Sequence, residues 1–307
     1  MFNKPINIIF IHRGKCNYLR SSLACARRSN PEANIFLIDD NGNCPFDSIK
    51  HYNINDYSDS AKEFAKKYQH FSSNPFDFEL FCIQRWFILL DFVKINGLEN
   101  FFYADSDVLI FSNLTSEWPK FSNFSFTLSE GSSGHNSFWN SPKILDDFCN
   151  FVMNIYSQKD KIGYKNIVDF WKNYQLSNKA GGVCDMTLFR FYKERCPGIV
   201  GETAIIINDS TYDDNFSSGI QNGVRYKMSI FGTKKIYWKS DEPYGKDNFG
   251  KLIKFNTLHF QGDKKRYIGR AYQRKNIYAW GSFVKGKVII ILKKIGLFKL
   301  FIKLKNI

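Results

Sequence analysis

Two aspartates lie at the centre of an apolar segment, FFYADSDVLIF, at residues 101–111. On a regular strand, residues i and i+2 face the same side, so the carboxylates of Asp105 and Asp107 would repel each other. Burying such a pair without a partner is costly. The conflict disappears if the strand ends near Ala104 and a divalent cation lies between the carboxylates. We therefore predict that they bind Mg²⁺ or Mn²⁺, which would neutralise a diphosphate leaving group. An exposed turn is the simpler alternative.

The first forty residues predict a parallel βαβ unit that would position such a site. Apolar runs at residues 6–11 and 35–38 flank a helical pattern at residues 18–29. Ligand sites of parallel sheets lie beyond the carboxyl ends of the strands. Asp39 and Asp40 follow the second run, so they are expected at this edge.

A long apolar helix is predicted at residues 77–95, directly before the Asp105 strand, with Arg85 in its middle. We read residues 1–262 as one α/β domain with a mostly parallel central sheet flanked by helices. Further elements are predicted as follows: strands at 124–128, 135–139, 204–207 and within 226–238, and helices from 142 to 156 and from 185 to 192.

Composition and charge narrow the class of protein. With 44% hydrophobic and 17% aromatic residues among 307, the chain is not a disordered protein. Seven cysteines, odd in number and without a C-x-x-C pair, indicate reduced thiols in a cytosolic protein. The net charge of +14 is concentrated after Asp263, where thirteen lysines and arginines occur without an acidic residue. The rest of the chain is close to neutral, which argues against a nucleic-acid-binding protein.

The basic segment at residues 263–307 mixes lysines with Ile, Leu and Phe. This pattern predicts an amphipathic tail that associates with an anionic membrane surface on its cytoplasmic face. A packing helix at the C-terminus is the alternative. No run of about 18 uncharged apolar residues predicts a membrane span, and the apolar run near the N-terminus is too short for a signal peptide.

The motif at residues 105–107 resembles the D-x-D of GT-A fold glycosyltransferases, which holds a metal ion on a nucleotide-sugar diphosphate. Residues 259–265, HFQGDKK, are similar to the H-x-x-G-x-x-K of glycosyltransferase family 8. This resemblance implies that His259 is a third metal ligand, that Lys265 contacts the diphosphate, and that Gly262 lets the backbone approach it. An imidazole ligand would shift the metal preference from Mg²⁺ toward Mn²⁺. The family continues with Pro-Trp, where this chain has Arg266 and Tyr267.

The same resemblance implies further residues that contact the nucleotide-sugar donor. Arg85 resembles an arginine that contacts the donor near the D-x-D, although an ion pair with a neighbouring acid of its helix is the alternative. Asp39, or Asp40, would contact the nucleotide base, unless it only forms a turn. Asn136 and Ser137 resemble residues that line the sugar pocket.

Two acids are candidates for the catalytic step. Asp185 opens a predicted helix at a place that resembles the D-Q motif near the transferred sugar, although a first-turn aspartate is also favoured there for helix stability alone. In a retaining reaction it would stabilise the transition state. In an inverting reaction either Asp185 or Glu130 would be the general base.

Together these features predict a metal-dependent glycosyltransferase that moves a sugar from a nucleotide-sugar to a glycan acceptor. The tail favours a lipid-linked acceptor of the lipopolysaccharide or capsule type, with the enzyme peripheral on the inner face of the membrane. A nucleotidyltransferase of similar fold is an alternative, because the loop at residues 12–15, HRGK, is a short version of the basic loop of such enzymes. A non-enzymatic nucleic-acid-binding protein is the third possibility.

Overall fold

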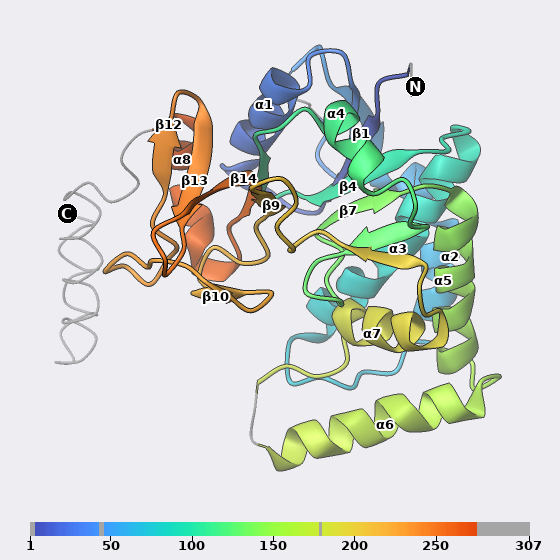
Figure 1. Ribbon diagram of the computed structural model, residues 1–307. Coiled ribbons are helices and arrows are strands. Elements are labelled where there is room, and N and C mark those ends of the chain that lie inside the picture. The colour runs from blue at the N-terminus through green and yellow to red at the C-terminus, as the bar shows by residue number, and fades with distance from the viewer. Residues whose placement is uncertain (1–3, 43–45, 178–179, 275–307) are drawn as a thin grey trace, which may run out of the picture.

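The centre of the molecule is a seven-stranded sheet, seen in a computed structural model that describes residues 4–42, 46–177 and 180–274. Strand β7 runs antiparallel to its neighbours, and the other adjacent pairs are parallel. The predicted α/β fold with a mostly parallel, helix-flanked sheet is therefore confirmed (Figure 1). In sheet order the strands are β3 (Lys50–Asn53), β2 (Asn34–Asp39), β1 (Asn7–His12), β4 (Phe101–Asp105), β7 (Asn136–Trp139), β6 (Phe126–Leu128) and β8 (Val200–Glu202).

Both faces of this sheet are apolar, because helices cover both. In β1, Ile8 and Phe10 point to one face and Ile9 and Ile11 to the other, and all four are buried. This two-sided burial explains why the parallel strands read as continuous apolar runs. The helices over the Ile9 face are α2 (Asp59–Ala65), α3 (Phe76–Ile95), α5 (Pro142–Tyr156) and α7 (Asp185–Arg195); those over the Ile8 face are α1 (Leu19–Ser29) and the short α4 (Leu114–Glu117).

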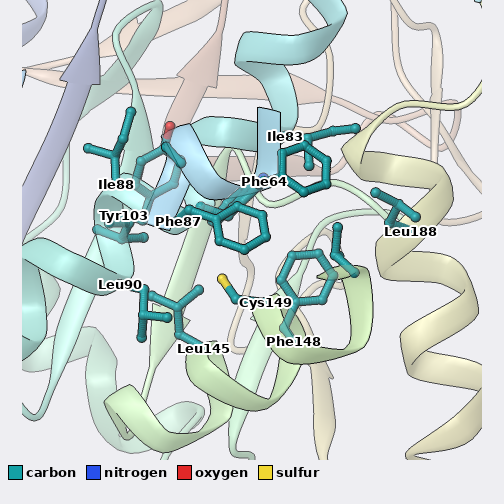
Figure 2. Close-up of a cluster of buried hydrophobic side chains, with 14 of the residues drawn as sticks. Phe64, Ile83, Phe87, Ile88, Leu90, Tyr103, Leu145, Phe148, Cys149 and Leu188 are labelled. Atoms are coloured by element: carbon teal, nitrogen blue, oxygen red, sulfur yellow. The ribbon is translucent and has the colours of Figure 1, made fainter. Parts of the chain in front are cut away.

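The larger core is built around α3, as its apolar sequence predicts. Figure 2 shows Phe87 of this helix close to Phe64 of α2, with Phe148 of α5 and Tyr103 of β4 in the same cluster. The rings of Phe64 and Phe87 stack with centroids 4.8 Å apart. Stacked aromatic pairs of this kind add to the stabilisation by burial, so α3 is fixed firmly beneath the strand that carries Asp105.

A second, five-stranded sheet lies beside the first (Figure 1). Its core contains Phe255 and Leu258 of β14 together with Tyr267 and Ile268 from the segment that follows. Its strands are β12 (Tyr237–Lys239), β13 (Glu242–Lys246), β14 (Leu252–His259), β5 (Val108–Ile110) and β9 (Ser210–Tyr212), followed in the chain by the 3-10 helix η3 (Gly262–Tyr267) and by α8 (Ile268–Tyr272). This packing places the start of the predicted tail against the second sheet.

Some predicted elements differ from the structure. Residues 204–207 do not form a strand; they are bends that end at Ile207, which bridges to Ser210. Within 226–238 only the start of β12 is a strand. Just before residue 226 the chain forms a hairpin of β10 (Ile220–Gln221) and β11 (Val224–Arg225). The Asn222-Gly223 turn of this hairpin has positive φ at both residues. Asn-Gly is the typical sequence of such turns.

Seven helical elements of the described residues were not predicted: α2, α4, η3 and α8, given above, and η1 (Ile54–Tyr57), η2 (Trp118–Lys120) and α6 (Lys161–Leu176). Helix α6 is the long outer helix at the bottom of Figure 1, and only Gly163 and Ile167 of it are buried. No helix among residues 4–42, 46–177 and 180–274 is long and apolar enough to cross a membrane. Residues 275–307, most of the predicted tail, lie outside the described part of the chain, and the division at residue 262 stays a prediction.

Replacing Asp160 by Asn is expected to remove a pH-dependent contribution to stability. Asp160 accepts a hydrogen bond from the backbone N–H of Gly163 (2.9 Å), which caps α6, and pairs with Arg195 of α7 (2.5 Å). The hydrogen bond from Arg195 lowers the pKa of Asp160 below its ordinary value of 3.8. The stabilisation is therefore present above pH 3.8 and is lost as the pH falls through the lower folded-state pKa.

The expected loss for Asp160→Asn is up to about 1 kcal/mol at pH 7. Urea unfolding at several pH values measures it, and the variant and the parent should converge in acid. Asp160→Ala is the matched variant, because it also removes the cap and should cost about 1 kcal/mol more. Equal stability of Asp160→Asn and the parent at pH 7 would contradict the role of the ion pair.

Candidate metal centre

The three predicted metal ligands lie at the junction between the two sheets. Asp105 is the last residue of β4 in the first sheet, and after Ser106 and Asp107 the chain enters the second sheet as β5. There β5 pairs with β14, so that Val108 lies opposite His259. The backbone N–H of Phe260 donates to the carbonyl of Asp107 (3.0 Å), which fixes this register. Ligand atoms of Asp105, Asp107 and His259 all lie within 4.8 Å of one another.

Hydrogen bonding sets the tautomer of His259. Its Nδ1 lies 2.6 Å from the backbone carbonyl of Asp214. A carbonyl can only accept, so Nδ1 must carry the proton, and in the neutral ring Nε2 has a free lone pair. Nε2 lies 3.6 Å from a carboxylate oxygen of Asp107. The ring therefore presents its basic nitrogen to the two aspartates.

A buried ion pair between Asp213 and Lys234 holds the backbone of His259 in place. The carboxylate of Asp213 accepts from the backbone N–H of His259 (2.9 Å) and pairs with Lys234 (2.5 Å). Both side chains of the pair are fully buried. Lys234 also donates to Gln221 (2.9 Å) and to the backbone carbonyl of Asn215 (3.0 Å). A fully bonded pair of this kind fixes the end of β14, because breaking it would leave a buried charge.

His135 was not singled out from the sequence, and it lies directly against His259. The two imidazoles stack with centroids 3.8 Å apart. Burial lowers the pKa of His135, and the neighbouring His259 lowers it further, so His135 stays neutral. It interacts with Ser133 through Nδ1 (2.7 Å) and with the carbonyl of Asp213 through Nε2 (3.2 Å). It packs against the ring of His259 and helps to hold it in place.

Asp105 is ionised by its surroundings. Burial alone would raise its pKa, but the charge of Arg85 and the hydrogen bond from the hydroxyl of Tyr103 hold it below the ordinary value of 3.8. Arg85 lies 2.6 Å from Asp105, and the Tyr103 hydroxyl donates to the same oxygen (2.8 Å). A deprotonated carboxylate is the form that binds a cation.

Arg85 also reaches the catalytic candidate Asp185. A second guanidinium nitrogen lies 2.6 Å from Asp185, whose same oxygen accepts from the indole N–H of Trp86 (3.0 Å). The alternative pairing of Arg85 with an acid of its own helix is wrong, because both of its ion pairs are with Asp105 and Asp185. One arginine thus joins a predicted metal ligand to a predicted catalytic acid.

The donor set fits a small divalent cation. Two carboxylates and one imidazole are hard to borderline ligands of the kind that Mn²⁺ and Mg²⁺ accept. Lys265 lies on the same rim, with Nζ 3.2 Å from Asp107, and 40% of its side chain is exposed. An exposed lysine beside a cation site can exchange its carboxylate partner for an anionic group of a ligand. The arrangement suits the binding of a cation together with phosphate.

Gly262 begins η3 between His259 and Lys265. Its φ is +61°, a conformation that residues with a Cβ rarely adopt. Glycine here lets the chain turn out of β14 so that Lys265 returns to Asp107. The structure thus brings together both ends of the H-x-x-G-x-x-K motif.

Asp39 and Asp40, the residues predicted to contact the nucleotide base, lie at the carboxyl end of β2. Asp39 ends β2, as predicted, but it is 2% exposed and its Oδ1 binds His51 of β3 (2.6 Å) and the backbone N–H of Asn41 (3.0 Å). Asp40 accepts from the backbone N–H of Gly14 (2.8 Å). Both acids line a crevice of about 650 Å³ beyond the ends of β1 and β2.

The side chains of Asn136, Ser137 and Glu130 bind groups other than the three metal-ligand candidates, although Asn136 lies opposite Ala104, the neighbour of Asp105, in the pairing of β4 with β7. Asn136 and Ser137 of β7 are fully buried, and their side chains bind protein groups, including Thr203 for Asn136 and Trp139 for Ser137. Glu130 is exposed and accepts from the backbone N–H of Asn222. Within the described residues, none of these three is bonded to the three metal-ligand candidates.

Gly182→Ala is expected to displace the backbone segment that precedes Asp185 at the start of α7. The backbone N–H of Val183 donates to the carbonyl of Phe71 (2.8 Å), which holds the segment before α7. A Cβ at Gly182 would lie 2.2 Å from that carbonyl oxygen and 2.5 Å from the Cα of Ser72. The backbone must move, and we expect a loss of about 1–3 kcal/mol in the free energy of unfolding.

Gly269→Ala in α8 is the matched control, because no atom lies within 4 Å of its Cβ position and its φ is not positive. It should be neutral or stabilising by up to about 1 kcal/mol. Chemical denaturation of both variants makes the comparison. Equal stability of the two variants would contradict the prediction, because it would mean that the backbone around Gly182 accommodates a Cβ without cost.

This chain resembles known proteins in structure, at low TM-scores, but not detectably in sequence. No protein-family model matches the sequence, and no curated protein matches it. Solved structures that match include three glycosyltransferases. Mouse xyloside xylosyltransferase 1 has a TM-score of 0.46 and 9% identity over 64% of this chain and 84% of that one. An active-site mutant of LgtC has a TM-score of 0.44 and 11% identity over 90% of this chain and 99% of that one.

The third, GlyE of Streptococcus pneumoniae TIGR4, has a TM-score of 0.35 and 12% identity over 67% of this chain. The matched region is 46% of the GlyE chain, so this chain spans less than half of that protein. At these identities and TM-scores, the likeness assigns neither substrate nor reaction to this chain. Membership of glycosyltransferase family 8 is not confirmed.

Proposed function

We propose that this chain is a metal-dependent glycosyltransferase of the GT-A type that uses a nucleotide-diphosphate sugar. The observation that carries the proposal is the convergence of Asp105, Asp107 and His259 at the sheet junction, with Lys265 on the same rim. Two carboxylates and an imidazole with its basic nitrogen turned inward make a cation site. The adjacent lysine makes the same place suitable for phosphate.

The chain's own groups have separate tasks in this proposal. A bound Mn²⁺ or Mg²⁺ would neutralise the charge that develops on the diphosphate leaving group. Lys265 would leave Asp107 and bind a phosphate oxygen, since it is exposed enough to turn. The imidazole of His259 favours Mn²⁺ over Mg²⁺. The same roles are implied by the resemblance of the two motifs to glycosyltransferase family 8. Membership of that family is part of what we propose.

Asp185 is the preferred catalytic residue, as stabiliser of the transition state in a retaining reaction or as general base in an inverting one. Arg85 and Trp86 hold one of its oxygens, and the other accepts from the backbone N–H of Met186 (2.9 Å). Arg85 joins it to Asp105, so it lies one side chain away from the cation site. Glu130 is the less favoured candidate, because its carboxylate binds the Asn222 backbone outside this cluster.

The donor contacts of Asp39, Asn136 and Ser137 stay predictions. Asp39 lines the crevice at the ends of β1 and β2, where its Oδ1 binds His51 and the backbone N–H of Asn41. Asn136 and Ser137 would have to give up bonds inside the protein. A role in the sugar pocket is therefore less favoured for these two.

A glycan acceptor, carried on a lipid at the cytoplasmic face of a membrane, completes the proposal. Its basis is the sequence of the basic tail, most of which lies outside the described residues. Truncation after Arg274 should give an enzyme that transfers to small acceptors but no longer sediments with anionic vesicles. Equal sedimentation of the full-length and truncated chains would exclude the membrane role.

The decisive experiment is a screen of nucleotide-sugars with the full-length protein and Mn²⁺. Release of a nucleoside diphosphate from one donor, dependent on the metal and lost in Asp105→Asn, is the expected result. Release of pyrophosphate from a nucleoside triphosphate would instead indicate the nucleotidyltransferase alternative. Binding of a nucleic acid without either reaction would exclude both enzymes.

A further inference from the structure

The hairpins between residues 220 and 249 have a buried side and a basic, exposed side. Exposure alternates along their strands, as expected where successive side chains point to opposite sides. The inward side chains, such as Tyr226 and Ile236, belong to the core of the second sheet. The outward side carries five cationic side chains, which we call the basic face: Arg225, Lys227, Lys235, Lys239 and Lys246.

Backbone pairing places three of these lysines in one row. The backbone N–H of Lys227 donates to the carbonyl of Lys246 (2.7 Å), and the carbonyl of Lys227 accepts from the backbone N–H of Lys235 (2.9 Å). The β-bridges on either side have the same antiparallel register, in which opposite side chains share a face. The ammonium groups of Lys235 and Lys246 lie 5.3 and 5.7 Å from the ring centre of Tyr237. Like charges are therefore held side by side around one aromatic ring.

The acids of the same hairpins have other partners. Glu242 pairs with Lys254 (2.5 Å), and Asp241 pairs with Arg274. Asp247 is buried and accepts from two backbone N–H groups. In the part of the chain that the structure describes, no carboxylate forms an ion pair with the basic face. A row of like charges without acids is unfavourable by itself, and it is complementary to an anionic partner.

Two apolar side chains lie in turns next to the basic face. Phe249, in the turn after Lys246, is 89% exposed, and Ile230, in the turn between Lys227 and Lys235, is 86% exposed. Lysines beside apolar tips are typical of interfacial membrane sites, where apolar groups enter the headgroup boundary and ammonium groups meet anionic lipid. A nucleic acid would bind the lysines but would leave Ile230 in water. The combination favours a membrane surface.

The predicted basic tail leaves the described part of the chain beside this face. Arg274, the last described residue, pairs with Asp241 in the turn between β12 and β13. In Figure 1 these two strands lie at the left of the molecule, away from α6. The sequence after Arg274 combines lysines with apolar residues, as the basic face does. A single weak element gives only marginal membrane attachment, so the basic face would add to the tail and not replace it.

We propose that the basic face docks on an anionic membrane surface, with Ile230 and Phe249 entering the headgroup region. The five cationic side chains would meet lipid phosphates, and the amphipathic ring of Tyr237 suits the same depth. Because β13 pairs with β14, which ends in His259, docking would hold the candidate metal centre in a fixed orientation to the bilayer. The docking itself does not depend on the function proposed above.

Lysine modification tests the docking in the full-length protein without nucleotide or metal. The protein is acylated with vesicles of equal parts phosphatidylglycerol and phosphatidylcholine, or of phosphatidylcholine alone, and each lysine is followed by mass spectrometry. Anionic vesicles should slow the modification of Lys227, Lys235 and Lys239 severalfold. The exposed Lys161 and Lys172 of α6 are internal controls and should not change. Equal rates at both sets would overturn the proposal, whether or not the tail brings the protein to the vesicles.

Charge reversal tests the contribution of the lysines. Lys235→Glu with Lys239→Glu should weaken binding of the full-length protein to anionic vesicles at least about fivefold, which is the effect of one lysine near an anionic surface. Lys161→Glu with Lys172→Glu is the control with the same change of net charge, and it should weaken binding by less than about twofold. Equal binding of the two double variants would contradict the proposal.

A second pair of substitutions tests the apolar tips. Ile230→Ser with Phe249→Ser should reduce the binding to anionic vesicles that remains at high salt. Ile162→Ser with Leu176→Ser is the control, because these side chains of α6 are 72% and 82% exposed. If the two double variants bind alike, the tips do not enter the bilayer, and the proposal is wrong. Protection of the basic-face lysines by a single-stranded oligonucleotide, but not by anionic vesicles, would also overturn it.

Discussion

Replacing Asp107 by Asn is expected to reduce metal-dependent transfer by more than about a hundredfold. Loss of a partner that only orients a metal ligand already costs about 10- to 100-fold, and Asp107 would itself bind the ion. The fold should survive, because the backbone bond between Asp107 and Phe260 remains and the change removes repulsion from Asp105. Calorimetric titration with Mn²⁺ should show the loss of affinity directly, and release of a nucleoside diphosphate measures the activity.

Asp263→Asn is the matched control for this variant. Asp263 lies in η3 near the same rim, but its carboxylate is 65% exposed and pairs with Lys264 at 3.2 Å. Its removal should change Mn²⁺ affinity and activity by less than about twofold. If Asp107→Asn binds Mn²⁺ as tightly as Asp263→Asn does, the cation site is not where the three side chains meet.

Arg85→Met is expected to cause the largest loss of stability, about 3–5 kcal/mol in the free energy of unfolding. The guanidinium is bonded to both Asp105 and Asp185 at 2.6 Å, and the exposed fractions of these carboxylates are only 19% and 6%. Methionine would fill much of the volume but leave two acids facing each other without a counter-charge. Urea denaturation of the metal-free protein measures the loss.

A second substitution separates charge from packing. Asp185→Asn in the Arg85→Met background should restore a large part of the stability, because only one unpaired carboxylate then remains. Lys62→Met is the surface control, since its partner Asp59 is 92% exposed, and it should cost no more than about 1 kcal/mol. A cost for Arg85→Met as small as for Lys62→Met would mean that Arg85 does not hold these acids together.

Elements with local signals were predicted well from the sequence. The apolar runs and the helical pattern of the first forty residues became β1, α1 and β2 within one residue at each end. The helix that begins at Pro142 has Ser141 as its cap, with the serine hydroxyl accepting from Lys143 (3.1 Å). Such signals act over a few residues, so they can be read without knowing the rest of the fold.

Contacts between distant segments could not be predicted in the same way. Nothing near Asp39 in the sequence indicates that His51, on β3, occupies its carboxylate. Neither does the segment around His259 indicate that it ends an eight-residue strand paired with β5. Its sequence, LIKFNTLH, alternates weakly, because β14 is paired on both edges and largely buried toward its end. The motif indicated His259 as a candidate ligand, but the strand pairing that brings this residue to Asp107 depends on the fold of the whole chain.

The passage of one continuous segment from the first sheet to the second has a mechanical consequence. Asp105 ends β4 of the first sheet, whereas Asp107 precedes β5 and His259 ends β14, which pair in the second sheet. An ion bound by all three would link the two sheets, so its affinity would depend on how the sheets are placed relative to each other. Mutations deep in either sheet that change this placement would then weaken ion binding without touching a ligand. Conversely, the ion would stabilise the arrangement of the sheets that binds it, by a free energy that grows with the logarithm of the ion concentration.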